Sequence, residues 1–126
     1  MPTRQIQRYQ QVVDRFDAVA RANLGSLMRI AELCRAAGVT PRTLSRAFHA
    51  IRGTAPSRYL HELRLSEVRQ ALLSDAGDSS VTDVAMRFGF RELGRFAVDY
   101  RARFGESPSE TLRRTAGAPV AANGRR

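Results

Sequence analysis

The residues of this chain that could do chemistry are a single cysteine, two histidines and a large set of arginines. Cys34 stands alone, which excludes an internal disulfide and a multi-cysteine zinc site, and neither His49 nor His61 lies at a metal-ligand spacing from it. The carboxylates are scattered, the serines lack a partnering His and Asp, and there is no glycine-rich phosphate loop. The sequence therefore predicts a protein that is not an enzyme and that binds neither a cofactor nor a metal ion.

Arginine dominates the charged residues. The chain has 21 basic residues, all of them arginine, against 12 acidic ones, and its formal net charge is +9. A GC-rich genome would explain arginine in place of lysine, but not the basic excess, which attracts polyanions such as nucleic acid. No apolar run approaches the roughly 20 residues that span a bilayer, and no signal peptide opens the chain. We therefore expect a cytoplasmic protein that binds nucleic acid and no membrane.

Helical periodicity dominates the chain, and strand-like alternation is nearly absent. The 126 residues are enough for one domain or for two small ones that share a connecting element. Capping and turn residues predict seven helices. In the first half of the chain, one helix ends at Leu24-Gly25, a second covers about 27–37, and a third extends from Thr40-Pro41 to Gly53. The others extend from Pro56 past Leu72, from Ser80 to Gly89, over about 92–104 and, as a short helix, from Pro108. We expect the Ala-, Gly- and Arg-rich residues 115–126 to be disordered.

The second half of the chain repeats the pattern of the first. The matched pairs are Leu33 and Val84, Cys34 and Ala85, Gly38 and Gly89, Val39 and Phe90, Leu44 and Phe96, Phe48 and Tyr100, Gly53 and Gly105, and Pro56 and Pro108. Each copy consists of a helix, a short turn with a glycine and a second helix, which is the helix-turn-helix plan. That plan needs a small residue where the helices cross and a glycine where the chain leaves the first helix. The sequence thus predicts an all-α protein with two such units.

The paired motifs also resemble a known family. The segments AGVTPRTLSRAFHAIRGTAPSRYLHELRL, VTDVAMRFGF and RFAVDYRARFGESPSETLR are similar to the DNA-binding domain of AraC/XylS-type bacterial transcription regulators, over about residues 27–114. The resemblance implies about seven helices in two homeodomain-like subdomains joined by a linker helix. The expected division is 1–55 for the N-terminal helix and first subdomain, 56–74 for the linker, 75–114 for the second subdomain and 115–126 for the tail.

The same resemblance implies a sequence-specific transcription regulator that binds double-stranded DNA, with two recognition helices in successive turns of the major groove. In the first recognition helix, Arg42, Ser45 and Arg46 match the family's base-contacting positions. Arginine can bond the guanine edge with two donors, although a phosphate contact remains an alternative for Arg46. Thr43 and His49 are expected to face the DNA backbone.

The second recognition helix departs from the family pattern. Gly94 and Val98 stand at its base-contacting positions, where the family often has a polar residue and commonly an arginine. Glycine reads no base edge, and valine offers only an apolar contact to a thymine methyl. Arg91, Arg95 and Arg101 are expected to contact the backbone. We therefore hypothesise that the first unit supplies most of the direct base contacts, while the second anchors the protein or senses DNA shape.

Two other classes of protein remain open from the sequence. A basic RNA-binding or ribosome-associated protein would explain the charge but not the repeat. A protein-interaction module would need the apolar face of the first helix, from Tyr9 to Leu24, to be uncovered. RNA polymerase is a candidate partner besides DNA. Because family members often carry a separate N-terminal sensing and dimerisation domain, we expect this chain to be a monomer, and a dimer only where such a domain accompanies it.

Overall fold

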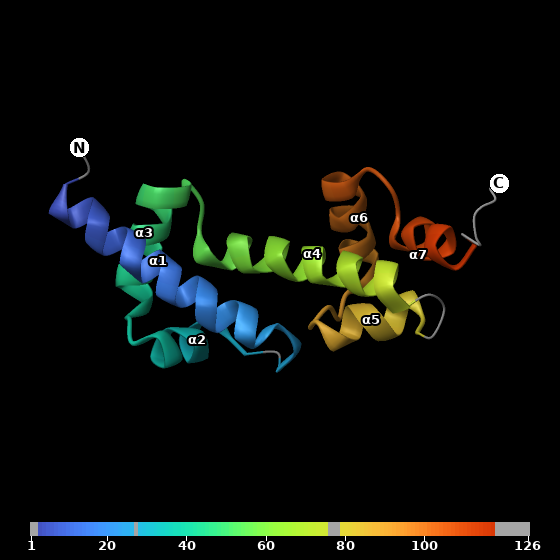
Figure 1. Cartoon of the computed structure of the whole chain (residues 1–126), viewed down its shortest axis with the longest axis horizontal. Helices are drawn as coiled ribbons and strands as arrows, with labels where there is room; N and C mark the ends of the chain where they lie inside the picture. Colours follow the sequence, from blue (N-terminus) through green and yellow to red (C-terminus); the bar gives the residue numbers. More distant parts are fainter. Residues whose placement is uncertain (1–2, 27, 76–78, 118–126) are drawn as a thin grey trace. The chain divides into compact units, whose positions relative to one another are not determined.

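The computed structural model describes residues 3–26, 28–75 and 79–117, and within them the chain forms seven α-helices and no strand (Figure 1). The helices are α1 (Arg4–Ala22), α2 (Ile30–Ala37), α3 (Pro41–Arg52), α4 (Pro56–Asp75), α5 (Val81–Arg87), α6 (Leu93–Phe104) and α7 (Pro108–Gly117), with a 3₁₀ turn at Leu24–Ser26. This confirms the predicted all-α class. The helices belong to two compact units, the first ending at Leu63 and the second beginning at Arg64.

The first unit is built on α1, which packs against both α2 and α3 (Figure 1). Its core is formed by buried side chains from all three helices: Val12, Val13, Phe16, Ala20, Leu33, Cys34, Leu44, Ala47 and Phe48. The rings of Phe16 and Phe48 meet edge to face, with their centroids 5.5 Å apart. Because the apolar face of α1 is covered in this way, the uncovered surface that a protein-interaction module would need is not there.

The second unit gathers α5, α6 and α7 around the second half of α4. The members of its buried core are Leu65, Val68, Leu72, Val84, Ala85, Phe90, Phe96 and Tyr100. The Tyr100 ring lies 4.7 Å from that of Phe104 and 5.8 Å from that of Phe96, measured between centroids. Helix α4 thus contributes side chains to both units, and the boundary between the units falls inside the segment predicted as a separate linker.

A chain of hydrogen bonds holds α7 in the second unit. The Tyr100 hydroxyl, which is buried, donates to the hydroxyl of Thr111 at 2.8 Å, and Thr111 in turn donates to the carboxylate of Glu106. Arg69 and Arg114 donate to the same carboxylate at 3.1 and 2.6 Å. The hydrogen bond from Thr111 and the nearby arginines hold the pKa of Glu106 below its ordinary value.

The predicted duplication is visible in the two turns. Gly38 and Gly89 have φ angles of 74° and 96°, a left-handed backbone conformation that glycine adopts at little cost and other residues rarely adopt. The N–H of Val39 donates to the carbonyl of Cys34, and the N–H of Phe90 to that of Ala85, each at 3.0 Å. Both first helices therefore end in the same Schellman turn. Cys34 is buried at the helix crossing, and burial raises the pKa of its thiol, which fits a core residue rather than a reactive one.

Two element boundaries differ from the prediction. Helix α2 begins at Ile30 rather than near residue 27, because Arg29 is still extended and its N–H donates to the side chain of Glu32 at 2.8 Å. Helix α7 continues to Gly117, and the Thr115 hydroxyl donates to the carbonyl of Thr111 within it. The first three residues of the predicted disordered tail are therefore helical, and residues 118–126 lie outside the described part of the chain.

Candidate nucleic-acid interface

The second helix of the first unit, α3, is fixed at its start and along its inner face. The Thr40 side chain accepts a hydrogen bond from the N–H of Thr43 at 3.1 Å, and Pro41 occupies the first helical position, as predicted. Leu44, Ala47 and Phe48 are fully buried. With this face held in the core, the opposite face of α3 is set in one orientation relative to the unit.

The outward stripe of α3 consists of Arg42, Ser45, Arg46 and His49, which follow the spacing i, i+3, i+4, i+7 of one helix face. Ser45 is half-buried and the other three are exposed. Neither Arg42 nor Arg46 forms a hydrogen bond or ion pair with the part of the chain that the structure describes. Thr43 is exposed beside the stripe, and its hydroxyl accepts from that of Thr40 at 3.0 Å. The two arginines of the stripe are therefore free to meet a ligand.

The corresponding stripe of α6 consists of Gly94, Ala97, Val98 and Arg101. The Val98 side chain is 64% exposed, and Gly94 has open space beside it. Arg101 donates to Glu110 at 3.3 Å, so the one charge on this stripe already has a carboxylate partner.

Two further predicted backbone contacts flank the stripe of α6. Arg95 pairs with Asp99 one helical turn along, with nitrogen and oxygen 3.5 Å apart. Arg91 is exposed in the turn before α6. The structure thus brings together Arg42, Ser45 and Arg46 on α3, and it leaves the face of α6 with apolar side chains and paired arginines.

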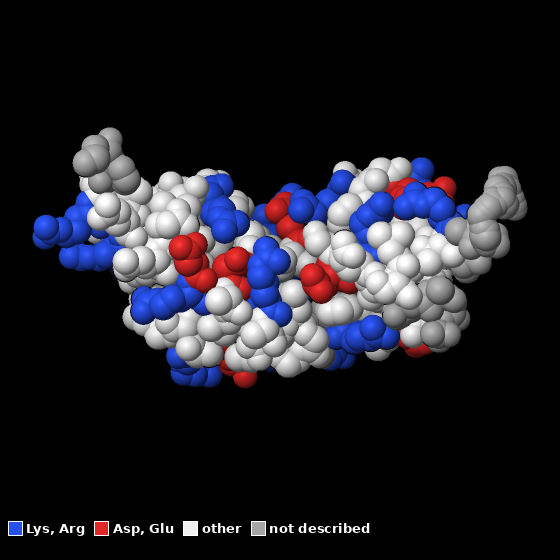
Figure 2. Space-filling view, in the orientation of Figure 1, with Lys and Arg blue, Asp and Glu red and all other residues white. Residues whose placement is uncertain are grey.

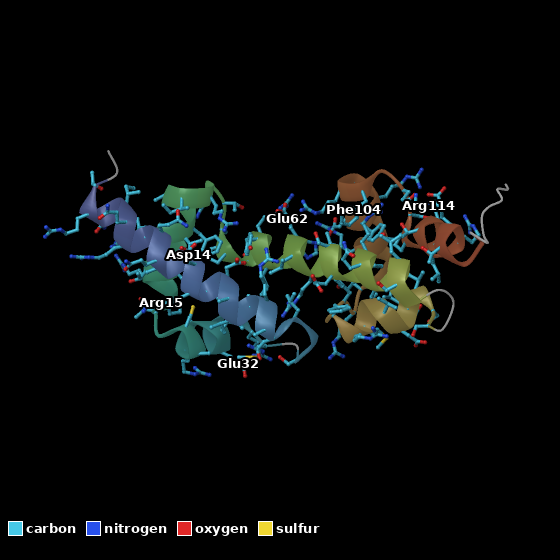
Figure 3. The ribbon with its side chains drawn as sticks, viewed as in Figure 1. Asp14, Arg15, Glu32, Glu62, Phe104 and Arg114 are labelled. Atoms are coloured by element: carbon cyan, nitrogen blue, oxygen red, sulfur yellow. The ribbon has the colours of Figure 1, made fainter. Side chains whose placement is uncertain are left out.

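A groove between α1 and α3 was not predicted from the sequence. It has a volume of about 460 Å³ and is lined by Arg8 and Arg15 of α1 and by Thr43 and Arg46 of α3, among others. In Figure 3, Arg15 extends from α1 on the side where α3 passes. The spacing of Arg8 and Arg15, two helical turns, was a signal available in the sequence, but it was indistinguishable from an ordinary solvated face.

Helix α1 is tied down by a polar network at the start of α4. The Tyr59 hydroxyl donates to the carboxylate of Asp17, and Arg21 donates to the same carboxylate at 3.1 Å. The guanidinium of Arg52 lies 4.8 Å from the centre of the Tyr59 ring. Figure 2 shows acidic and basic side chains interspersed over α1 on the face in view, so basic side chains alone do not cover this face. These contacts keep α1 in place beside α3.

Among the described residues, no helix is long and apolar enough to cross a membrane, and no three side chains of the metal-binding types gather in one place.

Comparison with known proteins gives the context of these helices. Residues 33–114 match a family model described as a helix-turn-helix domain. The chain is 41% identical over 107 residues to the XylDLEGF operon transcriptional activator of Pseudomonas putida, covering 83% of this chain and 32% of that protein. It is also 41% identical over 87 residues to a probable thc operon regulatory protein of Rhodococcus erythropolis, covering 68% of this chain and 26% of that protein. The chain thus spans about a third or less of the length of these relatives.

Two solved structures have a similar fold. A probable AraC family transcriptional regulator from Rhodopseudomonas palustris is 35% identical, with a TM-score of 0.72, over 84% of this chain and 97% of that chain. A transcriptional regulator with an AraC-type DNA-binding domain from Chromobacterium violaceum is 29% identical, with a TM-score of 0.75, over 85% and 94% of the two chains. The chain therefore belongs to the AraC-type family of helix-turn-helix transcription regulators.

Proposed function

We propose that this chain binds double-stranded DNA in a sequence-specific manner to regulate transcription, and that α3 makes most of the direct base contacts. The observation that supports this is the outward stripe of α3. It presents Arg42, Ser45 and Arg46 on one exposed face of a helix whose other face is locked into the core. An α-helix fits the major groove of B-DNA, where side chains reach the base edges.

The side chains of the stripe suit that task. A guanidinium can donate two parallel hydrogen bonds to the O6 and N7 of guanine, and a serine hydroxyl can bond several base edges. Arg46 lies in the middle of the helix, and because it has no partner within the described residues, binding does not require an internal ion pair to break. Thr43, beside the stripe, and His49, at its C-terminal end, contact phosphates.

Helix α6 takes the second, anchoring role in this proposal. Gly94 and Val98 present only small apolar groups to the base edges. The phosphate contacts of α6 come from Arg91, Arg95 and Arg101. Arg95 and Arg101 must exchange a carboxylate for a phosphate to do so, which is affordable because exposed ion pairs contribute only about 0.2–1 kcal/mol.

The proposal extends to the surroundings of the protein. The two recognition helices occupy successive turns of the major groove, a monomer spans the site, and RNA polymerase is a candidate partner in the cytoplasm. RNA is disfavoured as the ligand because single-stranded RNA is recognised largely by stacking on exposed rings. All nine aromatic side chains lie in the described residues, and each is buried or half-buried.

Selection from a randomised duplex library at near-physiological salt tests the proposal. We expect an enriched motif that extends across two adjacent turns of the major groove. Base-pair substitutions under each half of the motif then separate the roles of the units, with the larger losses expected under α3. Binding without any enriched motif would contradict sequence-specific recognition, and larger losses under α6 would contradict the division of roles.

A further inference from the structure

We propose that the groove between α1 and α3 binds the phosphate backbone of DNA, and that Arg8 and Arg15 of α1 contact the phosphates next to the base pair that Arg46 contacts. This inference rests on the proposed function. It adds a helix that lies before the residues matching the family model, which start at position 33.

The polar lining of the groove suits an anion. It contains the guanidinium groups of Arg8, Arg15 and Arg46 together with the side chains of Gln5, Gln11 and Thr43, and none of the described residues that line it is acidic. Amide and hydroxyl groups are common phosphate donors besides arginine. Its volume of about 460 Å³ leaves room for a sugar-phosphate unit.

The arginines of the groove are not committed to partners within the chain. Arg8 and Arg15 are exposed, and neither forms an ion pair or side-chain hydrogen bond with the residues that the structure describes. Asp14, the neighbouring carboxylate of α1 labelled in Figure 3, accepts a hydrogen bond from Gln10 at 2.8 Å and does not line the groove. Three like charges around one groove repel each other, and a polyanion removes that repulsion.

Arg46 connects the groove to the base-contacting face. It belongs both to the outward stripe of α3 and to the groove lining. When α3 lies in the major groove, the DNA backbone beside Arg46 must therefore pass the mouth of this groove. Phosphate contacts of this kind fix the register of a recognition helix without reading sequence.

The salt dependence of binding measures these contacts directly. Each phosphate neutralised on B-DNA contributes about 0.9 to the slope of log K against log salt concentration. The double variant Arg8→Gln and Arg15→Gln is expected to lower that slope by about 1.8 and to leave the preferred motif unchanged. The double variant Arg8→Lys and Arg15→Lys is expected to keep the wild-type slope, because counterion release depends on charge.

A matched control removes the same charge elsewhere. Arg35 on α2 and Arg113 on α7 are exposed and lie outside the groove, so Arg35→Gln with Arg113→Gln is expected to change the slope far less. Equal slopes in the two glutamine doubles, or a groove double with the wild-type slope, would overturn the inference. Circular dichroism checks that each variant is folded.

The result also separates this inference from the proposed function. The slopes are measured on the selected site and on a random duplex. If the wild-type protein shows no preferred motif, sequence-specific recognition fails, while the difference between the two doubles on random duplex still decides whether the groove holds phosphates. If a motif is found and the doubles behave alike, only the groove inference fails.

Discussion

Helices α3 and α6 are two copies of one element, with similar buried faces and chemically different outward faces. Their buried positions correspond closely: Leu44 and Phe48 in α3 match Phe96 and Tyr100 in α6, and all four are nearly or fully inaccessible. Their outward stripes share no such likeness, since Arg42 and Arg46 of α3 correspond in the repeat to Gly94 and Val98 of α6. Packing keeps the scaffold constant because any core change is felt by the whole unit, whereas the outer face is free to diverge.

One core contact, between each copy and the helix that follows it, does differ between the two units. In the first unit, the ring of Phe48 lies 5.2 Å from that of Tyr59, between centroids. At the equivalent places of the second unit, Tyr100 donates a hydrogen bond to Thr111. A contact between two rings in the first unit is thus replaced by a hydrogen bond between two hydroxyls in the second. The fold tolerates this because each buried hydroxyl has a partner.

The largest expected effect distinguishes the two stripes at equivalent positions. Arg46→Ala should weaken binding to the selected DNA by about 10- to 100-fold, since a bidentate arginine contact to a base is worth about 1–3 kcal/mol. Val98→Ala removes only an apolar contact and should change affinity by about threefold or less. Fluorescence anisotropy on one duplex measures both, with discrimination at the base pair under Arg46 expected to relax. Similar losses in the two variants would end the distinction between reading and anchoring.

Acid stability should distinguish the two units as well. Above its ordinary pKa of about 4.3, Glu106 is ionised in the folded and unfolded states, and its contacts stabilise the second unit. Its pKa is lowered in the folded protein, so this stabilisation is lost as the pH falls through the folded-state pKa. Glu106→Gln should cost about 1–2 kcal/mol of unfolding free energy at pH 7 and less at pH 3. The first unit has the uncharged Thr54 at the equivalent position.

Urea unfolding at the two pH values measures this effect. Asp14→Asn, which alters an exposed carboxylate of the first unit, is the matched control and should cost little at either pH. Part of the acid dependence will remain in the Glu106 variant, because hydrogen bonds from Ser107 also lower the pKa of Glu110. A Glu106 variant with the same loss at pH 7 and pH 3 would show that its charge plays no part.

The scaffold was predictable from the sequence, and much of the electrostatics was not. The turn of each unit requires a glycine, at Gly38 and Gly89, and the helix crossing requires a small residue, at positions 34 and 85. Because these requirements are local, the repeat can be recognised in the amino-acid sequence. The pairing of Arg95 with Asp99 is also local, but many i, i+4 pairs form no contact. The groove of Arg8, Arg15 and Arg46 depends on how α1 packs on α3, which no local pattern encodes.

Gly94 offers a smaller test of how closely α6 approaches DNA. It lies in the first turn of α6 with ordinary helical φ, and a Cβ built there would meet nothing within 4 Å. Gly94→Ala should therefore raise the unfolding free energy by about 0.5 kcal/mol, by reducing the freedom of the unfolded chain. DNA affinity should stay within about twofold. A tenfold loss of affinity in this more stable variant would instead show that DNA packs directly on the backbone of α6.

The smallest effect concerns the carboxylate that occupies Arg95. Asp99→Asn removes the partner 3.5 Å from the Arg95 guanidinium and a negative charge on the anchoring helix. Because exposed pairs are weak, DNA affinity should rise only about twofold, with a steeper salt dependence and an unchanged motif. Glu62→Gln, which removes the carboxylate 3.1 Å from Arg58 on α4, controls for net charge. A gain in affinity confined to Asp99→Asn would indicate that Arg95 contacts a phosphate. Equal gains in the two variants would mean that only the net charge of the protein matters, and the phosphate contacts of α6 would then be those of Arg91 and Arg101.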